Sequence, residues 1–205
     1  MLKKLPLMLL VLALVLTLTA VIIEDVEPAY GGVTFTVTKT ADTNDGVCGF
    51  DCSLREAITA ANASPGADTI AFNIPGPGPH TIQPLSALPT VTDAVTIDGY
   101  TEPGASPNTN GPGLGSNAVL KIELDGSAQP SGPGLLIDAD ASTVRGLVVN
   151  RFDSDGVYLF FSDGYVVEGN FIGTDITGTT DLEHWLRDKQ RGRRQQSGRG
   201  HSRGT

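Results

Sequence analysis

The sequence of 205 residues is poor in cysteine and in aromatic residues. It contains two cysteines, and aromatic residues make up 6% of the chain. Its 25 glycines and 13 prolines exceed the usual share but stay below the roughly 25–30% of disordered chains. This composition excludes a collagen, a coiled coil and a cystine-knot miniprotein. It favours a turn-rich, mainly β protein with enough apolar residues for one core.

Basic residues are scarce in the central part of the chain. Residues 21–180 hold five Lys or Arg against 20 Asp or Glu, whereas residues 181–205 hold seven Lys or Arg. The acidic part repels nucleic acid and anionic lipid, so we expect no nucleic-acid partner. Residues 183–205 form a basic tail rich in Gly and Arg that lacks any strand pattern.

The N-terminal segment has the pattern of an export signal. Two lysines precede an apolar run from Leu5 to Ile23, and acidic residues follow it. Ala20 suits the last position before a cleavage site, but Leu18 is unfavourable two residues earlier. The run is also close to the ~20 residues that span a bilayer. We therefore expect residues 1–23 to be a signal peptide or membrane anchor, and the remainder to be secreted or on the cell surface.

The two cysteines lie four residues apart, at Cys48 and Cys52. In an oxidising compartment such a pair forms a stable disulfide, which we predict here. A metal-binding pair is the alternative, but the three histidines are isolated in the sequence and form no second ligand cluster. Free thiols are the remaining alternative.

One strand and one helix are predicted near the cysteines. Val33–Thr38 alternates apolar and polar residues, as a half-buried strand does. Ser53 and Glu56 have the spacing of a capping box, which predicts a helix of roughly ten residues that ends within 62–66. The apolar face of this helix comprises Leu54, Ala57, Ile58 and Ala61.

Short apolar segments separated by turns fill the rest of the chain. Similar blocks begin at Gly134 and Gly156, 22 residues apart, and Asn150 and Asn170 lie near the ends of these blocks. A period in the low twenties favours a solenoid, in which each coil is buried against its neighbours. An antiparallel sandwich is the alternative. The predicted strands are Thr69–Ile74, Val95–Ile97, Val119–Leu124, Leu135–Ile137, Leu147–Val149, Val157–Phe161 and Tyr165–Val167.

The hexapeptide CSLREA, Cys52–Ala57, resembles the signature of the N-terminal CSLREA domain. It comes with a preceding strand and cysteine and with the continuation AITAAN. The segments His80–Gln83, Val95–Thr101 and Arg145–Phe152 resemble the right-handed parallel β-helix that usually follows this domain in bacterial surface and secreted proteins. The resemblance covers about residues 33–182.

This resemblance implies a mainly β fold, a right-handed parallel β-helix (solenoid) with an N-terminal cap that contains one short α-helix. The cap region would span residues 33–75, and residues 76–182 would form an incomplete set of coils. The helix would cover the open first coil, whose apolar side chains and strand edges need shielding.

Candidate catalytic groups occur in the predicted coils. Glycoside hydrolysis needs two carboxyl groups, for which Asp153, Asp155 and Glu168 are candidates, with Arg145 and Arg151 nearby in the sequence. However, Asp153 and Asp155 have the spacing of turn residues. We therefore assign no catalytic residue and expect a non-enzymatic protein.

We expect no cofactor, and calcium is the one candidate. The segment from Asp42 to Asp51 is rich in oxygen ligands, but Gly46 falls where the twelve-residue EF-hand loop needs a ligand. The long loop Gly99–Gly115 is a further candidate for ligand contact or a tolerated insertion.

These features favour an exported bacterial adhesion, carbohydrate-contacting or structural module. Its partner would be a surface polysaccharide or another surface protein, and it would meet the membrane only through residues 1–23. A fragment of a secreted polysaccharide lyase or glycoside hydrolase is the alternative. A one-base shift within codon 183 permits a further coil-like sequence, so we expect the tail to be out of the native frame and the chain to be a fragment.

Overall fold

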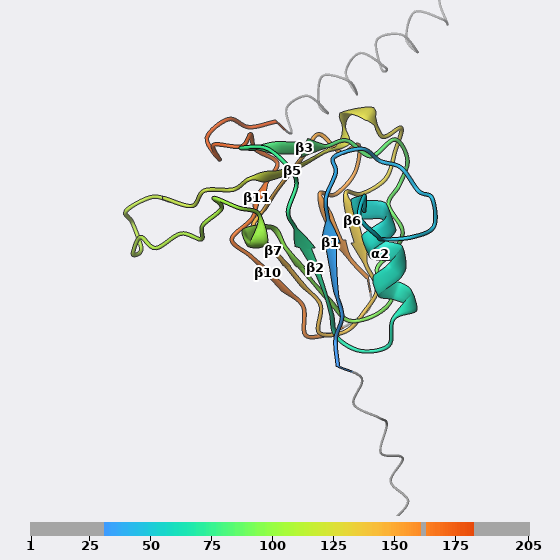
Figure 1. The fold of residues 1–205 in the computed structure, drawn as a ribbon. Coiled ribbons are helices and arrows are strands. Elements are labelled where there is room, and N and C mark those ends of the chain that lie inside the picture. The colour runs from blue at the N-terminus through green and yellow to red at the C-terminus, as the bar shows by residue number, and fades with distance from the viewer. Residues whose placement is uncertain (1–30, 161–162, 183–205) are drawn as a thin grey trace, which may run out of the picture. The chain divides into compact units, whose positions relative to one another are not determined.

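The computed structural model describes residues 31–160 and 163–182. Within these ranges the chain forms three parallel β-sheets and one α-helix, which confirms the mainly β prediction (Figure 1). The predicted signal or anchor segment and the basic tail lie outside the described residues. Among the described residues, no helix has the length and apolar character needed to cross a membrane.

Each sheet consists of strands that are far apart in the sequence. The first sheet contains, in spatial order, β1 (Thr34–Val37), β2 (Asp68–Phe72), β4 (Val95–Asp98), β7 (Thr143–Arg145) and β10 (Val166–Glu168). The second contains β3 (His80–Ile82), β5 (Ile122–Asp125), β8 (Leu147–Asn150) and β11 (Phe171–Ile172). The third pairs β6 (Leu135–Ile137) with β9 (Val157–Leu159), and Val91 bridges to Ile137.

The chain visits the three sheets in rotation. It passes from β4 to β5 to β6, returns to the first sheet at β7, and repeats the circuit through β8, β9, β10 and β11. Leu135 lies opposite Val157, which is the 22-residue spacing seen in the sequence. Asn150 and Asn170 do not occupy equivalent positions, because Val148 aligns with Phe171 and Asn150 with Asp125.

The core is a set of apolar rows that run across the strands. In the first sheet, Ile70, Ile97 and Val144 are aligned in register, and each is at most 1% exposed. Alternate residues of β2 are buried, as expected for strands with one face on the core. Since burying apolar area stabilises by ~25 cal/mol per Å², rows of isoleucine, leucine and valine stabilise these very short strands.

The helix α2 (Leu54–Ala63) begins where the sequence predicts. Ser53 is the N-cap: its Oγ accepts from the Glu56 backbone N–H, and Glu56 Oε2 accepts from the Ser53 N–H at 2.7 Å. Cys48 and Cys52 form a disulfide immediately before it. The four residues of the predicted apolar face, Leu54, Ala57, Ile58 and Ala61, are all buried.

The helix lies along the edge of the third sheet. Asn62 Nδ2 donates to the Thr90 carbonyl oxygen at 2.7 Å, and Asn62 Oδ1 accepts from Thr92 N–H at 2.8 Å. These backbone groups flank Val91, whose other side bridges to β6. The helix therefore covers an edge that would otherwise be open, and it also contacts β1 and β2 (Figure 1).

Three strands are not among those predicted from the apolar pattern: β3, which lies in a segment singled out only for its resemblance to β-helix coils, and β7 and β11. β7 contains a single strongly apolar residue, Val144, and β11 has only two residues, so neither gives a recognisable pattern. Both form because the preceding strands of their sheets fix them in register. The strands β1 and β2, in the predicted cap region 33–75, share one sheet with β4, β7 and β10.

Two Asp-Gly turns end strands in short 3₁₀ helices. These are η1 (Gly99–Thr101) after β4 and η2 (Gly126–Ala128) after β5. The Asp98 side chain accepts from Tyr100 N–H at 3.0 Å, and the Asp125 side chain accepts from Ser127 N–H at 2.8 Å. Aspartate satisfies the first free donors of each turn in this way.

Candidate functional site: a groove beside the projecting loop

The segment between β4 and β5, residues 99–121, forms a loop that projects from the body of the fold (Figure 1). It is closed by an antiparallel bridge between Ser106 and Val119. Beyond the bridge, Asn117 donates to Thr109 Oγ1 and accepts from the Thr109 N–H, each at 2.8 Å. The predicted loop is thus a hydrogen-bonded hairpin that can form one wall of a binding site.

A groove of about 520 Å³ lies between this loop and the outer face of the first sheet. Its volume falls within the range of small-molecule sites. One wall comes from the loop, and the other comes from the ends of β7 and β10. The lining residues are Tyr100, Pro107, Asn108, Arg145, Glu168 and Gly169.

Three charged residues form a row on one side of the groove. Asp98, Arg145 and Glu168 are aligned in register on neighbouring strands. Arg145 Nη2 donates to Asp98 Oδ2 at 2.7 Å, and this hydrogen bond is the main reason that the Arg145 pKa is raised above its ordinary value. The guanidinium charge is therefore largely balanced within the protein.

Tyr100 lies against two glycines that directly follow strands β7 and β10 of the first sheet. Its Oη donates to the Gly169 carbonyl oxygen at 2.8 Å. Gly146 and Gly169 both have positive φ, and a Cβ on either would collide with the tyrosine, so glycine is needed at both positions. Burial raises the Tyr100 pKa, and the nearby carboxylates of Glu168 and Asp98 raise it further.

The buried Glu102 carboxylate lies at the base of the loop, close to His80. Glu102 Oε2 accepts from the Ile74 N–H at 2.9 Å, and Glu102 Oε1 lies 3.3 Å from His80 Nε2. The His80 N–H donates to the Lys121 carbonyl oxygen, where the loop returns to the body. His80 is isolated in the sequence, and no local pattern connects it to Glu102, 22 residues away.

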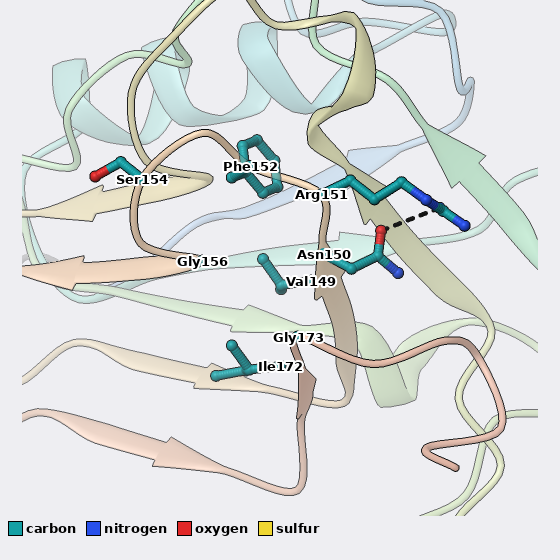
Figure 2. Close-up of a pocket in the computed structure, with 8 residues that line it drawn as sticks. All are labelled: Val149, Asn150, Arg151, Phe152, Ser154, Gly156, Ile172 and Gly173. Atoms are coloured by element: carbon teal, nitrogen blue, oxygen red, sulfur yellow. Dashed lines mark hydrogen bonds between the residues drawn. The ribbon is translucent and has the colours of Figure 1, made fainter. Parts of the chain in front are cut away.

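Another cavity is much smaller and lies between β8 and β11. Its volume of about 20 Å³ holds about one water molecule, so it is a packing gap. Figure 2 shows Val149, Phe152 and Ile172 around it, and Arg151 hydrogen-bonded to the side chain of Asn150. The Arg151 guanidinium points away to Asp125, at 3.1 Å.

The structure separates the candidate catalytic residues. Arg145 and Glu168 meet in the groove, whereas Arg151 pairs with Glu123 and Asp125 on the second sheet. Asp153 and Asp155 lie on the exposed turn between β8 and β9 and line neither cavity. Of the three candidate carboxylates, only Glu168 lines the groove.

The oxygen-rich loop 42–51 uses its side chains within the protein. Asp42 binds Arg55 at 2.8 Å, Asp45 Oδ1 accepts from the Val47 N–H, and Asp51 binds Lys39 at 3.0 Å. In the part of the chain that the structure covers, no three His, Cys, Asp or Glu side chains are grouped to hold a metal ion. Calcium stays a candidate cofactor.

Comparison of the chain with protein-family models, with curated proteins and with solved structures found no match.

Proposed function

We propose that this chain is an exported, right-handed parallel β-helix that binds carbohydrate without chemical conversion. The rotation of the chain through three parallel sheets supports the β-helix. Right-handedness is proposed because parallel crossover connections are right-handed in about 98% of cases. The resemblance of Cys52–Ala57 to the CSLREA signature and the export pattern of residues 1–23 support a surface or secreted location.

The groove beside the 99–121 loop is the observation that carries the binding proposal. It combines the aromatic ring of Tyr100, the amide of Asn108 and the charged side chains of Arg145 and Glu168. Aromatic rings stack on the apolar faces of sugars, while amide and carboxylate groups form hydrogen bonds with hydroxyl groups. An open groove on the side of a repetitive fold also suits an extended polymer.

Binding should depend on the groove residues. We expect Tyr100→Ala and Asn108→Ala each to weaken binding of neutral oligosaccharides about tenfold, a loss of about 1.4 kcal/mol, measured by calorimetry after a glycan-array screen. Tyr158→Ala is the matched control, because Tyr158 is 41% exposed and lies outside the groove. Equal binding by all three variants would contradict the proposed site.

A polysaccharide lyase or hydrolase is the second candidate, favoured only by the neighbouring Arg145 and Glu168 in the groove. Incubation of the chain with polysaccharides distinguishes the two functions. The binding proposal predicts no new reducing ends and no unsaturated products. Products that are lost on Glu168→Gln would support an enzyme instead.

A further inference from the structure

In the part of the chain that the structure describes, acidic residues far outnumber basic ones. This part holds 18 acidic residues against five basic ones, a formal net charge of −13 with His80 neutral. Each basic side chain is bound by a carboxylate or carbonyl oxygen of the protein. The pairs are Lys39–Asp51, Arg55–Asp42, Lys121–Pro77 O, Arg145–Asp98 and Arg151–Asp125, at 3.0, 2.8, 3.3, 2.7 and 3.1 Å.

The groove itself carries an excess of negative charge. Among the described residues, Arg145 is the only basic one that lines the groove, and Asp98 already balances that charge. Across residues 31–160 and 163–182, Glu168 forms no hydrogen bond and no ion pair, and its side chain is exposed. The negative charges of Glu168 and Asp98 both raise the pKa of Tyr100, which lines the groove, so both carboxylates interact electrostatically with this tyrosine.

We propose that the ligand of this groove is a glycan with free amino groups, such as a polymer of glucosamine. This inference rests on the proposed function and specifies its ligand class. A sugar ammonium would pair with the Glu168 carboxylate beside the Tyr100 ring, where a cation is also attracted to the ring face. A uronate would meet an acidic groove within an acidic body and would be repelled.

The test compares three tetrasaccharides by calorimetry at pH 6 and 0.15 M salt. They are a glucosamine tetramer, an N-acetylglucosamine tetramer and a galacturonate tetramer. We expect the glucosamine tetramer to bind at least tenfold more tightly than the acetylated one, and the galacturonate tetramer to bind most weakly. Short oligosaccharides limit the non-specific attraction of a polycation to an acidic protein.

Two variants that each remove one negative charge distinguish binding in the groove from general electrostatic attraction to the acidic protein. Glu168→Gln should reduce the glucosamine preference to less than threefold. Asp138→Asn should leave the preference within twofold of the original, because Asp138 is exposed and follows β6 in the third sheet. Equal losses in both variants would show non-specific attraction and overturn the inference.

The outcomes also distinguish this inference from the proposed function. If the acetylated tetramer binds as well as the glucosamine tetramer and binding still depends on Tyr100, the glycan site stands and the preference for amines is wrong. Tightest binding of galacturonate would likewise overturn the amine preference. If no tetrasaccharide or array glycan binds, both proposals fail.

Discussion

Replacing Glu56 with glutamine should lower the free energy of unfolding by about 3 kcal/mol at pH 7, measured by urea denaturation. The Glu56 side chain is fully buried, and its two oxygens accept from the backbone N–H groups of Asp45 and Ser53, at 2.9 and 2.7 Å. Lys39 Nζ lies 3.4 Å from Oε2. Glutamine has one acceptor oxygen, so one buried N–H would face an amide NH₂ group.

The effect should depend on pH. Burial alone raises the Glu56 pKa, but the hydrogen bonds from Ser53 and Asp45 and the charge of Lys39 outweigh it and hold the pKa below the ordinary 4.5. A lowered folded-state pKa stabilises the fold above the unfolded-state pKa, and this contribution is lost as pH falls through the folded value. The difference between wild type and Glu56→Gln should therefore shrink below pH 4.5.

The matched control is Asp51→Asn, which changes an exposed carboxylate bound to the same lysine. The Asp51 side chain is 75% exposed, so this variant should lose less than about 1 kcal/mol. A loss of similar size in both variants, or a Glu56→Gln effect that does not change with pH, would show that Glu56 does not hold the loop and helix together.

The last strands along the described chain, β9, β10 and β11, should open far more readily than the strands in the middle of each sheet. Leu159, Val167 and Ile172 are 41%, 39% and 42% exposed, while the residues aligned with them one strand earlier are at most 1% exposed. Those aligned residues are Ile137, Val144 and Val149. We expect amides of β10 and β11 to exchange hydrogen at least 100-fold faster than those of β2 and β8.

The sheet edges formed by β9, β10 and β11 should cause the chain to self-associate. β9, β10 and β11 are the last described strands of their sheets, and they combine unpaired edges with exposed apolar side chains. Sedimentation should show concentration-dependent oligomers that Val167→Lys reduces. Leu85→Lys, at a residue 65% exposed elsewhere, should have no such effect. A monodisperse chain with equal protection in β2 and β10 would contradict both expectations.

Local patterns were sufficient for much of the fold. The capping box at Ser53 and Glu56 predicted the start of α2, because both partners lie within one helical turn. Apolar segments bounded by Asp-Gly turns predicted most strands, since the turn residues and the alternation act within a few positions. The cysteine spacing likewise predicted the disulfide.

The groove could not have been predicted from these patterns. Arg145 and Glu168 were candidates, but their separation from Arg151, Asp153 and Asp155 depends on which sheet each strand joins. The loop Gly99–Gly115 was a candidate for ligand contact, but no local pattern singles out Tyr100, whose hydroxyl binds a carbonyl 69 residues away. The two glycines that accommodate Tyr100 gave no signal, because glycine is abundant throughout the chain.

The sequence by itself determined the mainly β character, the helix α2 with its cap, and the acidic character of the body, because these depend on composition and on neighbours in the chain. Only the tertiary structure decided which charges are balanced. Arg145 and Asp98 are 47 residues apart and meet through strand register. Register between distant parallel strands is set by burial of whole apolar rows, so the groove and its exposed Glu168 emerge only when the sheets assemble.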